Sequence, residues 1–119
     1  EKKDYGKAIS VITWKGYREV VMEYTTDSHT VWKDDNGRII DLHCFEYVED
    51  GILYDRYTFP SETFSGKGNI GNIEVTCINP EAQVQFHLGY EYDENDVHDV
   101  LLLCRTFNLE IPEQYKTHI

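Results

Sequence analysis

The chain has 119 residues, of which 22 are acidic and 11 are basic, so its formal net charge at pH 7 is −11. Nucleic acids and anionic membranes are recognised through basic surfaces, so this charge argues against both as partners. The longest strongly apolar run has five residues, which is too short to span a bilayer. The length predicts a single β-rich domain over residues 1–119 with a sizeable core.

The cysteines indicate a reducing compartment. Cys44, Cys77 and Cys104 are odd in number, far apart in the sequence, and not arranged as a CxxC pair. Each lies in an apolar segment, which predicts buried free thiols instead of a disulfide framework. We therefore expect a cytoplasmic protein.

The first predicted element is a β-hairpin near the N-terminus. Residues 8–14 and 17–26 form two apolar-rich arms on either side of Lys15-Gly16. Glycine tolerates the positive φ that a tight turn needs, so the break is interpreted as the hairpin turn.

A second hairpin is predicted from residues 29–33 and 38–48. Asp34-Asp35-Asn36-Gly37 between them carries the strongest turn chemistry in the chain, because asparagine and glycine both tolerate left-handed dihedrals. Residues 52–59 predict the next strand, which Pro60 ends.

Residues 60–71 predict the one long irregular connection of the chain. Its last six residues, Gly66 to Gly71, match G-x-G-x-x-G, but a dinucleotide-binding loop of that pattern opens a helix. Here residues 72–78 resume the alternation of a strand. The segment is therefore interpreted as a flexible connection between strands and not as a phosphate-binding loop.

Residues 82–92 show the most regular alternation of apolar and polar side chains in the chain. This alternation predicts a half-buried β-strand with Phe86 on its inner face. Asn79-Pro80-Glu81 is interpreted as a turn, so this strand is expected to pair antiparallel with residues 72–78.

Residues 97–107 carry apolar side chains at helical spacing, with candidate N-caps just before them, and predict an amphipathic helix. An eighth strand is the alternative interpretation. The fold class is therefore α+β: a twisted antiparallel sheet of about seven strands with one C-terminal helix packed on it. The alternative is an all-β eight-stranded barrel or sandwich.

No local motif indicates catalysis. The acidic run at residues 93–99 has the oxygen density of a calcium loop, but Val97 and His98 stand where an EF-hand needs a ligand and a glycine. The five histidines show no HxH or HExxH spacing. His43 and Cys44 are neighbours, so a strand would send their side chains to opposite faces. The sequence therefore predicts no enzyme, and no catalytic, cofactor or metal site.

The uneven charge suggests a binding function. Between Lys67 and Arg105 the chain has no lysine or arginine and seven acidic residues, and tyrosines beside carboxylates are typical of surfaces that meet lysine and arginine. A small, acidic, β-rich domain of this kind resembles, in composition alone, immunity proteins that neutralise toxins. The hypothesis is an inhibitor-like module that neutralises or regulates a basic protein partner, such as a nuclease toxin. The predicted contact residues are Glu91, Asp93, Glu94, Asp96 and Asp99, with Tyr47, Glu49 and Asp50 as a second patch.

Two other functions stay open at this point. One is a carrier of a small apolar ligand in a β-barrel cavity, and the other is a structural or virion component. The sequence leaves the oligomeric state open.

Overall fold

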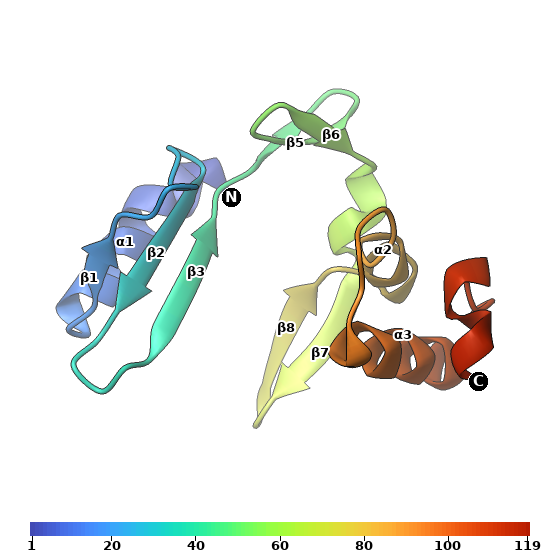
Figure 1. Ribbon diagram of the computed structural model, residues 1–119. Coiled ribbons are helices and arrows are strands. Elements are labelled where there is room, and N and C mark those ends of the chain that lie inside the picture. The colour runs from blue at the N-terminus through green and yellow to red at the C-terminus, as the bar shows by residue number, and fades with distance from the viewer. The chain divides into compact units, whose positions relative to one another are not determined.

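The computed structural model describes residues 1–119 and divides them into two compact units, Glu1–Ser61 and Glu62–Ile119 (Figure 1). Helices and antiparallel sheets are both present, so the α+β class is confirmed. The single sheet of about seven strands is wrong, because the strands form two three-stranded sheets and one two-stranded sheet. That the chain is one domain stays a prediction, and each unit is described by itself.

The N-terminal unit begins with a short 3-10 turn, η1 (Lys2–Asp4), and helix α1 (Tyr5–Trp14), where a β-arm had been predicted. Gly16, with φ of 93°, ends a helix instead of forming a hairpin turn. Its N–H donates to the carbonyl of Thr13, and the N–H of Tyr17 donates to the carbonyl of Ile12, both at 3.0 Å. This pair of bonds is the Schellman motif, which closes helices at a glycine of positive φ.

Three strands of the N-terminal unit form an antiparallel sheet in the order β1-β2-β3: β1 (Arg18–Val20), β2 (His29–Lys33) and β3 (Ile39–His43). The predicted strand at residues 29–33 and the turn after it are confirmed. Asp34 holds that turn, because its Oδ1 accepts the backbone N–H of Asn36 at 3.0 Å and of Arg38 at 2.8 Å.

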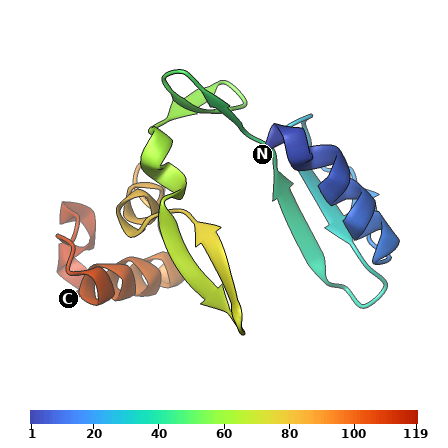
Figure 2. The same cartoon turned by 180° about the vertical axis from the view of Figure 1, so that it is seen from behind.

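Helix α1 lies against one face of this sheet (Figures 1 and 2). The hydroxyl of Tyr5 is 2.9 Å from Oγ1 of Thr30, which also accepts the indole N–H of Trp32 at 2.9 Å. Because side chains alternate along a strand, Thr30 and Trp32 face the helix and the side chains of His29 and Val31 face away from it.

The second sheet of this unit is formed by β4 (Glu46–Val48), β5 (Gly51–Tyr54) and β6 (Tyr57–Phe59). The strand predicted at residues 38–48 is thus divided between β3 and β4. The one predicted at 52–59 is divided between β5 and β6. Asp55 adopts φ of 54° in the two-residue turn between β5 and β6, a conformation that aspartate tolerates better than most residues.

The C-terminal unit starts with a hairpin of β7 (Gly66–Ile70) and β8 (Ile73–Cys77), which follows the 3-10 turn η2 (Ser61–Phe64). The G-x-G-x-x-G segment is therefore a strand and a tight turn, not an irregular connection. β8 confirms the strand predicted at residues 72–78, but its partner is β7 and not residues 82–92.

The strand predicted at residues 82–92 is wrong, because α2 (Pro80–Gln85) occupies its first part. Oδ1 of Asn79 accepts the backbone N–H of Ala82 at 2.7 Å, and Pro80 takes the first helical position. Asparagine as N-cap followed by proline is a helix-start signal. Phe86, expected in the core, is 43% exposed, whereas Val84 is 4% exposed.

Residues 97–107 lie in α3 (Glu94–Phe107), which Asp93 caps through its side chain. The helix packs against α2 and the 3-10 turn η3 (Glu113–His118), and not on a seven-stranded sheet as predicted. The core of this unit consists of four buried side chains: Val84, Val100, Cys104 and Tyr115.

All three cysteines are free thiols, as predicted, although only Cys104 is fully buried. Among the helices, not one combines the length and apolar character that crossing a bilayer requires.

Candidate functional site

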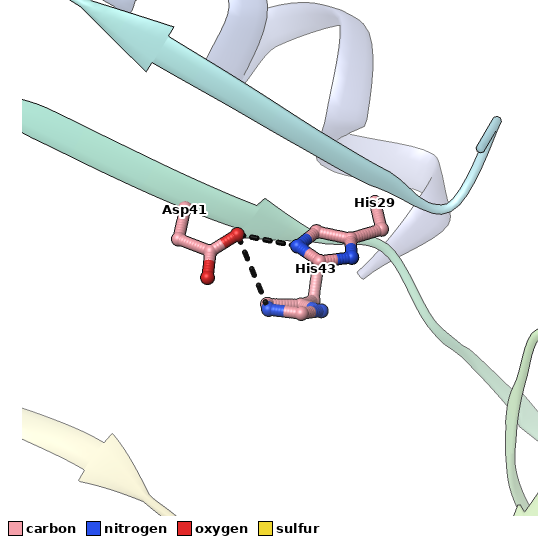
Figure 3. Close-up of side chains that lie close together, drawn as sticks. All are labelled: His29, Asp41 and His43. Atoms are coloured by element: carbon pink, nitrogen blue, oxygen red, sulfur yellow. Dashed lines mark hydrogen bonds and ion pairs between the residues drawn. The ribbon is translucent and has the colours of Figure 1, made fainter. Parts of the chain in front are cut away.

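The side chains of two histidines and one aspartate lie close together on the β1–β3 sheet of the N-terminal unit, and we call them the cluster (Figure 3). His29 comes from β2, and Asp41 and His43 come from β3. The antiparallel register pairs His29 with His43 and Val31 with Asp41, so the three side chains share one face. This face is the one that points away from α1.

The carboxylate of Asp41 joins the two histidines. Its Oδ1 lies 2.5 Å from Nε2 of His29 and 3.5 Å from Nε2 of His43. The two imidazole rings stack on each other with centroids 4.1 Å apart. The side chain of Asp41 is 58% exposed and that of His43 is 47% exposed, so solvent and small molecules reach the carboxylate.

A tyrosine orients one of the imidazoles. The hydroxyl of Tyr54, on β5, lies 2.7 Å from Nδ1 of His43, which leaves Nε2 of the same ring facing Asp41. Burial raises the pKa of Tyr54, and the negative charges of Asp55 and Asp41 raise it further. The hydroxyl therefore stays protonated at neutral pH and remains available to hold the ring.

This arrangement supports two kinds of chemistry. An exposed carboxylate held in position by neighbours can accept a proton from a bound hydroxyl group. Two imidazole nitrogens and a carboxylate oxygen can also bind a divalent metal ion. The choice between them depends on what the protein acts on.

Comparison with known proteins identifies the family of the chain. Residues 7–103 match the model of the aminoglycoside-2''-adenylyltransferase family. The chain belongs to this family. The three clustered residues all lie within the matched range.

Two relatives of this adenylyltransferase-family chain are named for lincosamides. A lincosamide resistance protein of Staphylococcus haemolyticus is 31% identical over 67 residues, which are 51% of this chain and 41% of that protein. The crystal structure of a lincosamide antibiotic adenylyltransferase with lincomycin bound has a TM-score of 0.70 and 26% identity. That match covers 87% of this chain and 67% of the crystallised one.

Family membership corrects the functional predictions. The inhibitor-like module, the basic protein partner, the apolar-ligand carrier and the absence of enzymatic function are all contradicted, because the family and the crystallised relative are adenylyltransferases. The structural or virion component loses its basis for the same reason. The negative charge was the main signal for a binding function, and surface charge alone does not distinguish a binding face from a solvated one.

None of the predicted contact residues belongs to the histidine–aspartate cluster. Tyr47, Glu49 and Asp50 belong to the β4–β5 hairpin, and the other five belong to residues 91–99 of the C-terminal unit. Asp93 and Asp96 form the capping box of α3, and Asp99 lies 3.1 Å from Nδ1 of His98. That these residues contact a partner stays untested. The basic protein partner that motivated the prediction is contradicted by the family comparison.

The three cluster residues were not predicted from the sequence, although all three lie in the hairpin that was predicted. A search for HxH and HExxH spacing passes over Asp41-x-His43, although residues two apart on a strand share a face. A turn centred on residues 34–37 also places His29 opposite His43. The register of the hairpin, more than any local motif, was the available signal.

Proposed function

We propose that the protein transfers an adenylyl group from a nucleoside triphosphate to a hydroxyl group of a lincosamide antibiotic. Asp41 is the base that accepts the proton of that hydroxyl. Family membership supports the reaction class, and the names of the two relatives favour a lincosamide over an aminoglycoside as acceptor. The regions of similarity span only part of each relative, so the proposal concerns both the activity and the substrate.

The reaction needs a group that takes up a proton. The acceptor oxygen attacks the α-phosphorus of the nucleotide, the bond to pyrophosphate breaks, and the hydroxyl proton moves to a base. A base must be exposed enough to reach the substrate and fixed enough to be aimed at it. The observation that carries the proposal is that Asp41 meets both conditions, because its side chain is 58% exposed while His29 holds its Oδ1.

The cluster fits a base better than a magnesium site. Phosphoryl-transfer enzymes usually bind the nucleotide together with Mg²⁺, which prefers oxygen ligands. Two of the three donors in the cluster are imidazole nitrogens. We therefore assign the cluster to the acceptor hydroxyl and derive no step through a bound magnesium ion.

Mass spectrometry tests the proposal directly. The purified protein is incubated with ATP and Mg²⁺, once with lincomycin and once with an aminoglycoside, and each antibiotic is examined for a covalent AMP adduct. We expect the adduct on lincomycin, with release of an equal amount of pyrophosphate. An adduct on the aminoglycoside alone would refute the substrate class, and no adduct on either antibiotic would refute the activity.

A further inference from the structure

The donor set of the cluster matches a class of metal ion other than magnesium. Nε2 of His29, Nε2 of His43 and a carboxylate oxygen of Asp41 are two nitrogens and one oxygen, with possible ligand atoms all within 4.8 Å of one another. Imidazole is a preferred ligand of Zn²⁺ and of the neighbouring first-row ions, and three protein ligands leave a position open for water.

One of the distances in the cluster already matches the spacing that zinc requires. With bonds of about 2.0–2.1 Å, tetrahedral ligand atoms lie roughly 3.4 Å apart. Nε2 of His43 and Oδ1 of Asp41 are already 3.5 Å apart. The 2.5 Å between Nε2 of His29 and Oδ1 of Asp41 must widen by roughly 0.9 Å to reach that spacing. Rotation of the exposed Asp41 side chain widens this distance, and one of the two stacked rings, whose planes are 23° apart, must also turn so that both Nε2 lone pairs point at one ion.

The scaffold holds the donors in position. Five consecutive residue pairs join β2 to β3, from His29 with His43 to Lys33 with Ile39, so the backbones that carry the three donors are fixed. Tyr54 supplies the outer-shell partner that metal-binding histidines commonly have, since its hydroxyl contacts Nδ1 of His43 and leaves Nε2 facing the cluster.

We propose that His29, Asp41 and His43 bind a divalent first-row transition-metal ion of the Zn²⁺ type, and that the bound ion inhibits adenylyl transfer. Inhibition follows because the ion takes up the carboxylate oxygen that would accept the hydroxyl proton. The inhibitory half rests on the proposed function. The metal site itself does not, because only the three side chains and their geometry carry it.

Calorimetric titration with Zn²⁺ tests the site without any turnover. The purified chain, freed of metal with a chelator, is compared with His29→Gln, His43→Gln and the control His98→Gln. His98 also lies beside a carboxylate, that of Asp99, but outside the cluster. We expect one zinc site, weakened by at least about tenfold in the two cluster variants and unchanged in the control. Equal affinity in all four proteins would overturn the site.

The absorption spectrum of bound Co²⁺ distinguishes binding at this site from binding at the free thiols. Cys44 and Cys77 are half-buried and could take up zinc independently. Co²⁺ bound through nitrogen and oxygen gives visible bands without the near-ultraviolet band of a thiolate ligand. A thiolate band that accompanies the single binding event would overturn the assignment to His29, Asp41 and His43. Far-UV circular dichroism checks that each variant keeps its secondary structure.

Rates with and without Zn²⁺ test the inhibitory half. Each variant is compared with its own zinc-free rate of AMP transfer, so that a lower basal rate does not affect the result. We expect zinc to inhibit the original protein and His98→Gln, and to inhibit His29→Gln much less. Zinc that binds without slowing transfer would overturn the inhibition alone. A protein inactive even without zinc would refute the proposed function, and the titration would still decide the metal site.

Discussion

The hydroxyl of Tyr54 lies 2.7 Å from Nδ1 of His43, and this contact joins the β4–β6 sheet of the N-terminal unit to the cluster on β2 and β3. The ring centroids of the two residues are 5.5 Å apart. His43 is therefore held from two sides, by Tyr54 at Nδ1 and by the stacked ring of His29. Its orientation in the cluster depends on a residue that is 11 positions away in the sequence.

Tyr54→Phe should lower the affinity for Zn²⁺ by about tenfold, because loss of an outer-shell hydrogen bond typically weakens a metal site by this order. Calorimetric titration measures the change. Tyr57→Phe is the matched control, since Tyr57 is the cross-strand neighbour of Tyr54 on β6 and is 58% exposed. Equal affinities for the two variants would show that the Tyr54 hydroxyl does not orient His43.

Asp41→Asn should reduce the rate of AMP transfer to lincomycin by a factor of about 10² to 10⁴, the usual contribution of a general base. Asparagine keeps the size of the side chain but cannot accept the hydroxyl proton, so kcat should fall much more than KM changes. Steady-state kinetics measures both constants.

The control for this substitution is Asp35→Asn. Asp35 lies in the turn between β2 and β3 and pairs with Arg18 at 3.0 Å, with both side chains at least 80% exposed. The Asp35→Asn substitution removes a carboxylate from the same hairpin and leaves the three residues of the cluster unchanged. An Asp41→Asn protein that retained the rate of this control would remove Asp41 from the role of base.

The parts of the fold that could be predicted from sequence are those that local chemistry decides. The hairpin of β2 and β3 follows from an Asn-Gly turn between two short apolar runs, and Asp34 completes that turn with two backbone hydrogen bonds. The start of α3 likewise follows from a capping box of Asp93 and Asp96. In both places the residues that fix the backbone are neighbours in the sequence.

The errors arose where alternation was given more weight than end signals. Residues 82–92 alternate as a strand would, but Asn79 and Pro80 begin a helix there, and the same apolar residues serve a short helix equally well. Gly16 suits a hairpin turn and a helix C-terminus alike. The site was missed for a different reason, because His29 reaches Asp41 and His43 only through pairing between strands.

Asn79→Ala should destabilise the protein by about 1 kcal/mol, the usual cost of losing a helix N-cap. Asn79 also donates through Nδ2 to the carbonyl of Glu62 at 2.8 Å, so the substitution removes a second bond. Denaturant unfolding followed by circular dichroism measures the change. Asn95→Ala is the control, because Asn95 is exposed in the first turn of α3. Equal costs for the two variants would show that the Asn79 side chain does not stabilise the start of α2.

Tyr90 and Asp96 should give the C-terminal unit a stability that depends on pH at both ends of the scale. The Tyr90 hydroxyl donates to Oδ1 of Asp96 at 2.8 Å, and this bond raises the pKa of Tyr90 from its ordinary value of 10.0 to about 12. The backbone N–H of Asp93 donates to the same carboxylate, and this bond, with that from Tyr90, lowers the pKa of Asp96 below its ordinary value of 3.8.

The direction in which stability changes with pH depends on whether the folded or the unfolded state binds each proton more tightly. The folded state holds the Tyr90 proton more tightly than the unfolded state, so this stability is complete below pH 10.0 and is lost as the pH rises to about 12. The folded state keeps Asp96 ionised more readily, so that stability is present above pH 3.8 and is lost as the pH falls below it.

The difference in unfolding free energy between the original protein and Tyr90→Phe should therefore be constant near neutral pH. It should shrink as the pH rises from 10.0 to about 12 and as the pH falls below 3.8. Denaturant unfolding at a series of pH values measures this difference. Tyr47→Phe, which removes the hydroxyl of a tyrosine of the N-terminal unit, is measured beside it as the control. A Tyr90→Phe difference that stayed constant through that window would mean that the hydrogen bond to Asp96 does not hold the Tyr90 proton.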